Sequence, residues 1–115
     1  MRLRRGDIAL VYFPYSDLST IKQRPVLVVQ ANNLKTGLPQ IVVAMISSNM
    51  RRANHPSRIP IVLGGSEAAG SGLRTDSVIL TDTLATIEFS LISRRLGRLR
   101  DTQSVDDALR TTLGL

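Results

Sequence analysis

Short apolar runs separated by turn-forming residues fill the first two thirds of the chain. Four of them are rich in β-branched or aromatic residues, which is typical of strands; they lie at 7–13, 25–31, 40–47 and 58–63. The runs at 25–31 and 40–47 are almost continuously apolar, which indicates strands buried on both faces. Pro60 removes a backbone donor, so the run that contains it is predicted to lie at a sheet edge.

A change of periodicity marks the last third. Residues 76–81 and 83–88 predict two more strands, and residues 95–99 predict a short last one. Beyond Asp101, which can cap a helix, apolar or small residues recur at spacings of three and four, as on one face of a helix. These residues are Val105, Ala108, Leu109, Thr112 and Leu113. Gly114 stands where such a helix would stop.

These elements predict a mainly β (α+β) fold: a small, partly closed barrel with one end covered by the C-terminal helix. The polar segments 14–23 and 49–57 are predicted loops, and the glycine-bounded connection after 58–63 has one helical turn at 67–69. With 115 residues and no linker or repeat, the chain is predicted to form a single domain, 1–115.

The charge balance of the chain indicates what kind of partner it binds. The formal net charge is +6, and 13 of the 15 cationic side chains are Arg. Such a balance favours an anionic partner, nucleic acid first, with a solvated basic surface as the alternative. Because the chain has no Cys and one His, a disulfide, a Cys nucleophile and a His-rich metal site are excluded. We expect no metal, no cofactor and no membrane segment, and a cytoplasmic location.

Several short strings then follow one another in a recognisable order. They are RGDI at 5–8, FPYSD at 13–17, RPVLVV at 24–29, VAMISS at 43–48, GLRTDSV at 72–78, RLGRL at 95–99 and VDDAL at 105–109. Asp82 and Thr86-Ile87 follow the fifth string at the matching distance. Each string alone is weak, but in this order they resemble the MazF/PemK family of toxin–antitoxin endoribonucleases over about the whole chain.

This resemblance implies a fold, an activity and partners. The implied structure is a homodimer of SH3-like barrels with the active site in a groove along the dimer interface. The family cleaves single-stranded RNA without metal and leaves a 2′,3′-cyclic phosphate and a 5′-hydroxyl. Its partner is an antitoxin, expected to be acidic, whose C-terminal segment occupies the RNA groove. Operator DNA is contacted only indirectly, through the antitoxin.

The residue types fit that chemistry. RNA carries its own nucleophile, the 2′-hydroxyl, so the enzyme has to move protons and stabilise charge on phosphorus. The resemblance places the catalytic arginine at Arg24, whose planar fork binds two phosphate oxygens. It places a catalytic hydroxyl at Ser47, where the family usually has Thr, with Ser48 as the alternative. Asp82 matches an aspartate that PemK-like members use near the scissile phosphate, and a turn or cap role is its structural alternative.

The remaining candidates are residues expected to bind RNA: Tyr15, Ser16, Ser48, Arg51, Arg52, Arg74, Ser77 and Thr83. Asp76 could line the groove, but it is expected rather to cap or buttress its loop. His55 is expected to be a solvated loop residue. The run Arg94, Arg95, Arg98 and Arg100 could bind RNA, but it is expected rather to form a solvated strand face or to dock an acidic antitoxin tail.

Three positions depart from the family pattern. Leu80 stands where PemK-like members have Arg, Thr83 where Gln is common, and Ala85 where a later Arg is found. These departures favour a mechanism that rests on Arg24 and Ser47. They also keep two alternatives open: a non-catalytic toxin like CcdB, which shares the fold and poisons DNA gyrase, and a degenerate member that only binds antitoxin or RNA.

Overall fold

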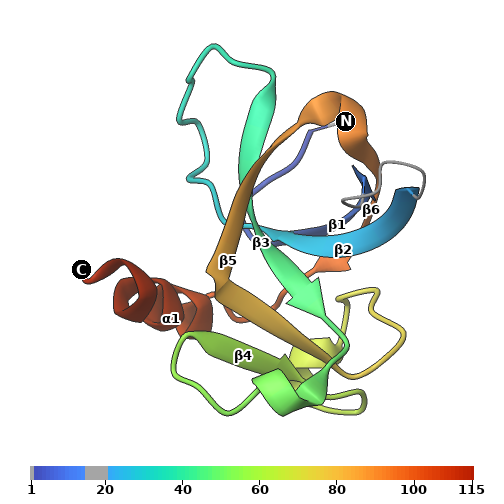
Figure 1. Cartoon of the computed structure of the whole chain (residues 1–115), viewed down its shortest axis with the longest axis vertical. Helices are drawn as coiled ribbons and strands as arrows, with labels where there is room; N and C mark the ends of the chain where they lie inside the picture. The colour runs from blue at the N-terminus through green and yellow to red at the C-terminus, as the bar shows by residue number, and fades with distance from the viewer. Residues whose placement is uncertain (1, 15–20) are drawn as a thin grey trace.

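The computed structural model describes residues 2–14 and 21–115 and shows a strongly bent antiparallel sheet followed by a helix (Figure 1). Within these residues the sheet has six strands in the order β4-β5-β3-β2-β1-β6. The strands are β1 (Asp7–Pro14), β2 (Ile21–Val28), β3 (Gln40–Ser47), β4 (Arg58–Ile61), β5 (Ser77–Glu88) and β6 (Ile92–Arg98). Three short 3-10 helices, η1 (Met50–Arg52), η2 (Ser66–Ala68) and η3 (Phe89–Leu91), and one α-helix, α1 (Gln103–Leu113), complete the fold.

Burial agrees with the hydrophobic pattern. Alternate residues of the central strands enter two apolar clusters, so that Ile8 and Leu27 belong to one cluster and Ala9 and Val26 to the other. The strand with Pro60 lies at one end of the sheet, as predicted. The prediction of a mainly β fold with a C-terminal helix is therefore confirmed.

The second strand differs from its predicted range, 25–31. It begins at Ile21, because the hairpin with β1 continues to the pair Pro14↔Ile21, so residues 21–23 of the predicted loop belong to the strand. It ends at Val28, because the amides of Val29 and Gln30 both donate to the carbonyl oxygen of Val42, which breaks the regular ladder.

The predicted strands 76–81 and 83–88 are one strand, β5. Its pairing with β3 jumps from Met45↔Leu80 to Ala44↔Leu84, so Thr81, Asp82 and Thr83 have no partner on β3. This is a β-bulge, which bends a strand without ending it (Figure 1). Three polar residues inside an apolar run look like a turn in the sequence, and here they form that bend.

The helix confirms its predicted position. The N-cap is Thr102, one residue after the predicted cap, and its side chain makes no capping hydrogen bond, while Asp101 accepts a hydrogen bond from the Gln103 amide at 2.8 Å. Gly114 ends α1 with a φ of 71°. Val105 and Ala108 are buried against the cluster that contains Ile8. In residues 2–14 and 21–115, no helix has the length and apolar character needed to span a membrane.

The connection between β4 and β5 packs backbone to backbone against β6. The Arg98 amide donates to the Gly70 carbonyl at 2.8 Å. A Cβ atom at Gly97 would lie 2.2 Å from the Gly70 oxygen, and one at Gly72 would lie 2.3 Å from the Leu96 oxygen. No side chain fits at either position, so these two glycines allow the connection to close the side of the barrel beside β6.

We expect Gly97→Ala to destabilise the fold by roughly 3 kcal/mol, because the added methyl group collides with backbone atoms that cannot move independently. Gly64→Ala is the matched control. Gly64 has a φ of +87° and nothing near its Cβ position, so that change costs only about 1 kcal/mol of backbone strain. Urea unfolding measures both, and equal losses would show that the close approach is not required.

Candidate active site

A cleft of about 400 Å³ opens where the end of β3 meets β2, β6 and the segment before β5. Its walls come from residues far apart in the sequence: Leu10, Gln23, Arg24, Pro25, Ile46, Ser47, Ser48, Gly72, Leu73, Arg74, Thr75, Ser77, Arg94 and Leu96. The lining contains five predicted site residues, Arg24, Ser47, Ser48, Arg74 and Ser77. The structure therefore brings together two of the three predicted catalytic residues.

Arg24 and Ser47 are held by the sheet itself. Arg24 is half-buried in β2, opposite Val11 of β1. Ser47 ends β3, and its Oγ accepts a hydrogen bond from the Asn49 amide at 3.1 Å. Because that contact uses an acceptor position, the Ser47 hydroxyl hydrogen can still be donated to a ligand.

The wall opposite β2 is shaped by hydrogen bonds within its own loop. The Ser77 hydroxyl is buried and donates to the Thr75 carbonyl at 2.9 Å. Asp76 accepts a hydrogen bond from the Leu63 amide at 2.8 Å, which fits the buttressing role expected of it. Ser77 lines the cleft, but its hydroxyl proton is already engaged in holding this wall.

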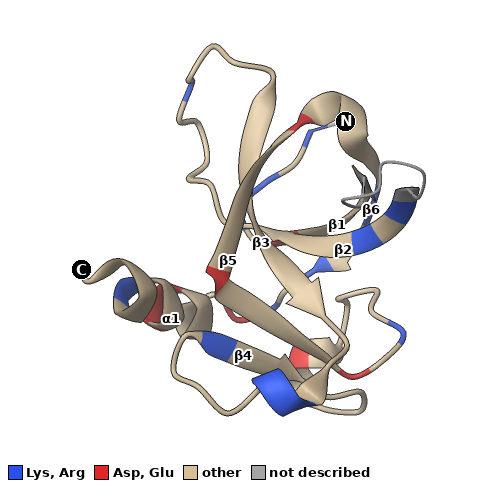
Figure 2. Cartoon of the chain, in the orientation of Figure 1, with Lys and Arg blue, Asp and Glu red and all other residues tan. Residues whose placement is uncertain are grey.

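Three arginines line this cleft, and the residues described as lining it include no Asp or Glu. Arg24 comes from β2, Arg74 from the loop before β5 and Arg94 from β6. Figure 2 shows cationic residues on β2 and on that loop. The same loop also carries an acidic residue close to its cation, and the other acidic residues of the described chain lie elsewhere. A cavity whose described charged lining residues are all arginines suits a polyanion such as a nucleic acid backbone.

Asp7 binds two residues of the dense arginine run that do not line the cleft. Its carboxylate is 3% exposed and contacts Arg98 Nη1 at 2.9 Å and Arg95 Nε at 3.2 Å. The Arg4 amide donates to its other oxygen at 2.8 Å. The side chains of Arg95 and Arg98 are 47% and 41% exposed, which fits the expected solvated strand face, and their contacts with Asp7 also tie β6 to the start of β1.

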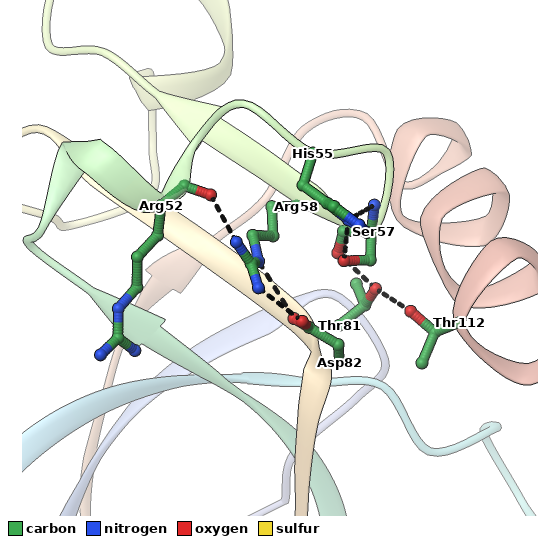
Figure 3. A network of polar contacts seen from close by, with 7 residues as sticks. All are labelled: Arg52, His55, Ser57, Arg58, Thr81, Asp82 and Thr112. Carbon is green, nitrogen blue, oxygen red and sulfur yellow. Dashed lines mark hydrogen bonds and ion pairs between the residues drawn. The ribbon is translucent and has the colours of Figure 1, made fainter.

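Asp82 lies outside the cleft, on the bulge of β5. Arg58 holds it through Nη2 at 2.8 Å and Nε at 3.4 Å, and Arg58 Nη1 also donates to the Arg52 carbonyl at 3.2 Å (Figure 3). The hydrogen bond from Arg58 lowers the pKa of the Asp82 carboxyl below its ordinary value. Thr83, the next residue, is exposed and is also absent from the cleft lining.

Beside this ion pair, a polar chain connects the 49–57 segment to the helix. His55 Nδ1 lies 2.7 Å from Ser57 Oγ, the Ser57 carbonyl accepts from the Thr81 hydroxyl, and Thr81 Oγ1 lies 2.9 Å from Thr112 Oγ1 (Figure 3). His55 is exposed and remote from the cleft, which agrees with its predicted role as a loop residue.

Of the other candidates, Arg51 and Arg52 are exposed on η1, close in sequence to Ser48 but outside the cleft lining. Tyr15 and Ser16 lie outside the described residues.

A family model for the PemK-like, MazF-like toxin of type II toxin–antitoxin systems matches residues 4–113. The chain belongs to this family. The match confirms the family drawn from the order of the sequence motifs. Four of those motifs contribute residues to the walls of the cleft.

Individual relatives agree with this membership. The toxin is 32% identical to Endoribonuclease EndoA of Bacillus subtilis (strain 168), over 100% of this chain and 97% of that one. Two solved structures share its fold. A mycobacterial endoribonuclease in complex with its cognate antitoxin matches with a TM-score of 0.78 and 20% identity, over 99% and 97% of the two chains. The Mycobacterium tuberculosis toxin MazF-mt6 matches with a TM-score of 0.72 and 24% identity, over 95% and 97%.

A second, larger groove of about 750 Å³ lies at the other ends of β2 and β3. The N-terminal segment, the 30–35 connection and Phe89 line it, and it shares no residue with the cleft. None of the predicted site residues of the toxin lies there. Among the residues that the structure describes, no group of three or more His, Asp or Glu side chains is placed to hold a metal ion.

One residue of the cleft was missed by the sequence reasoning. Arg94 was grouped with its neighbours in a charge run, and no motif singled it out. Alternation along a strand would have separated it from Arg95, but the sequence alone did not show which face of β6 is turned toward the cleft.

Asp7→Asn tests the internal ion pairs. Burial raises the pKa of the Asp7 carboxyl, but the Arg4 amide and the Arg95 and Arg98 guanidiniums outweigh burial and hold that pKa below its ordinary value of 3.8. A lowered pKa means that the ionised carboxylate stabilises the folded state. We expect Asp7→Asn to cost roughly 1.5–3 kcal/mol at pH 7, the usual worth of hydrogen bonds to a charged group.

The difference between wild type and variant should remain constant down to about pH 4 and then vanish as the pH falls through the pKa of the folded protein. Urea unfolding across this pH range measures it. A difference that persists unchanged at the lowest pH would show that the charge on Asp7 contributes nothing.

Proposed function

We propose that this toxin is an endoribonuclease that cleaves single-stranded RNA, mRNA included, without a metal ion. The observation that carries the proposal is a cleft lined by both Arg24 and Ser47, in which the described charged lining residues are all arginines. The endoribonuclease relative from Bacillus subtilis supports the same reaction class.

The reaction uses a nucleophile that the substrate brings. The 2′-oxygen attacks phosphorus as its proton leaves, the bond from phosphorus to the 5′-oxygen breaks, and that oxygen takes up a proton. The products are a 2′,3′-cyclic phosphate and a 5′-hydroxyl. Each step moves protons or negative charge, so general acid–base catalysis and electrostatic stabilisation suffice.

Arg24 is proposed to bind the scissile phosphate through both of its non-bridging oxygens. Negative charge grows on these oxygens as the 2′-oxygen attacks, so a guanidinium fixed in the sheet stabilises the transition state more than the ground state. Ser47 donates its hydroxyl hydrogen to the same phosphate and fixes its orientation. The Asn49 amide, which holds Ser47 Oγ, makes this donor less mobile.

Asp82 is the less suited of the predicted catalytic residues. Its lowered pKa keeps it ionised at neutral pH, so it has no proton to give to the leaving 5′-oxygen. Its carboxylate is also occupied by Arg58. A catalytic part for Asp82 would require this ion pair to open when RNA binds.

The proposed partners follow from the basic surface around the cleft. Arg51, Arg52 and Arg74, with Ser48 and Thr83, are proposed to contact the RNA strand, and Tyr15 and Ser16 to approach it from the 14–23 loop. We propose that the toxin acts in the cytoplasm as a homodimer, with the cleft beside the dimer interface. An acidic antitoxin would compete with RNA for the cleft and carry any contact with operator DNA; a mycobacterial structural relative is described in complex with its cognate antitoxin.

Arg24→Ala is expected to reduce kcat for cleavage of a single-stranded RNA by about 10²–10³-fold, the usual cost of removing one preorganised charge stabiliser. Ser47→Ala should cost less, about tenfold, since one neutral hydrogen bond is lost. Ser47→Thr keeps the hydroxyl and should retain activity. Gel-resolved cleavage under single-turnover conditions measures all three variants.

Arg110→Ala is the matched control, because it removes one arginine from the exposed face of α1, away from the cleft. Cleavage by Arg24→Ala at the wild-type rate would contradict the proposal. Growth arrest that survives this substitution would favour a toxin that acts by binding alone, and a gyrase inhibition assay would then separate the CcdB-like alternative.

A further inference from the structure

The short helix η1 comes just after Ser47 in the chain, and hydrogen bonds hold it where packing does not. None of its residues is buried. The preceding residue, Asn49, binds the turn at both ends. Its amide donates to Ser47 Oγ at 3.1 Å. Its side-chain oxygen accepts from the Arg51 amide at 3.2 Å, and its carbonyl oxygen accepts from the Arg52 amide at 3.1 Å. Ser47 and η1 therefore form one hydrogen-bonded unit.

Arg58, the first residue of β4, connects this unit to the sheet. Its Nη1 donates to the Arg52 carbonyl at 3.2 Å, while its Nη2 and Nε donate to the Asp82 carboxylate at 2.8 and 3.4 Å. Figure 3 shows the guanidinium of Arg58 between these two acceptors, with the guanidinium of Arg52 pointing away. Among the residues that the structure describes, no other side chain joins η1 to a strand by a hydrogen bond.

The bulge of β5 holds Arg58 in turn. Thr81 and Asp82 have no partner on β3 and face the start of β4 instead. The amide and the hydroxyl of Thr81 both donate to the Ser57 carbonyl, and Asp82 binds Arg58, the residue after Ser57. Bulges beside active sites commonly redirect a side chain. Here the bulge gives two consecutive residues of the chain, Ser57 and Arg58, a partner each.

We propose that Arg58, held by Asp82, is a positioning residue for Ser47: it anchors η1, and η1 orients the hydroxyl that donates to the scissile phosphate. This inference rests on the proposed function. It gives Asp82 a part in the reaction without a proton transfer, because its carboxylate acts only on Arg58. Neither Arg58 nor Asp82 lines the cleft. It follows that the loss of Arg58 lowers the rate no further than the loss of the Ser47 hydroxyl does.

The test is a double-mutant cycle between Arg58 and Ser47. The maximal single-turnover rate is measured for wild type, Arg58→Ala, Ser47→Ala and the double variant on a single-stranded RNA with one cleavage position. Arg58→Ala should lower this rate about fivefold, within the roughly tenfold loss expected for Ser47→Ala. In the Ser47→Ala background it should cause no further loss, because the hydroxyl that it positions is already absent.

Variants of Asp82 separate positioning from proton transfer. Asp82→Asn keeps an acceptor oxygen for Arg58 and should stay within about twofold of the wild-type rate, whereas Asp82→Ala should match Arg58→Ala. Arg58→Lys, which keeps the charge without the fork, should recover part of the loss. Arg110→Ala, the control, removes an exposed arginine that is also paired with an aspartate and should match wild type. Circular dichroism checks that each variant is folded.

Losses that multiply in the double variant would overturn the inference, because Arg58 would then act independently of Ser47. A wild-type rate for Arg58→Ala or for Ser47→Ala would also overturn it. Losses of about 10²-fold or more for both Asp82→Asn and Asp82→Ala would assign the carboxyl a direct proton transfer instead.

Failure of the proposed function is recognised separately. If folded wild type cleaves no RNA, that function fails, and the anchor is measured without RNA. Hydrogen exchange of the Arg51 and Arg52 amides, followed by NMR, should be faster in Arg58→Ala than in wild type and unchanged in Arg110→Ala. Equal exchange in Arg58→Ala and wild type would show that Arg58 does not anchor η1 and would overturn the inference by itself.

Discussion

The contact on which the rest of the structure depends is the backbone approach between the Gly70–Gly72 segment and Leu96–Gly97 of β6. The sheet ends at β4 on one side and at β6 on the other, and this segment bridges them on its way to β5. Without a Cβ at Gly72 and Gly97, the two backbones meet directly. The same segment contributes Gly72, Leu73 and Arg74 to the cleft lining, so the closure of the barrel also forms the cleft.

This fold pairs some of the arginines with carboxylates and places others in the cleft. Asp7 binds Arg95 and Arg98, Asp106 binds Arg5, and Asp82 binds Arg58. Each pair connects elements that are distant in sequence, and each lies outside the cleft. The carboxylates thereby neutralise arginines that hold the fold, and the charged residues described as lining the cleft are all arginines. A net charge of +6 is therefore a poor guide to function until the pairs are known.

Much of the fold could be predicted from the sequence, because apolar periodicity reports which residues face a core. It located α1 and the buried strands, and Pro60 identified an edge. It divided β5 in two, since Thr81-Asp82-Thr83 has the composition of a turn and only the pairing with β3 shows a bulge. The motifs located Arg24 and Ser47, because these residues belong to motifs that open or close a predicted strand. The partner of Asp82 and the direction of Arg94 depend on contacts between distant segments, which one sequence does not reveal.

The central claim is that the substrate supplies the nucleophile while Arg24 and Ser47 stabilise the phosphate. Its most direct test is mass spectrometry of the fragments formed when the purified toxin is incubated with single-stranded RNA in EDTA. The account predicts 2′,3′-cyclic phosphate and 5′-hydroxyl ends, and no cleavage at a position where the nucleotide before the scissile bond is 2′-deoxy. Fragments with 5′-phosphate and 3′-hydroxyl ends, or cleavage after the 2′-deoxy nucleotide, would contradict it.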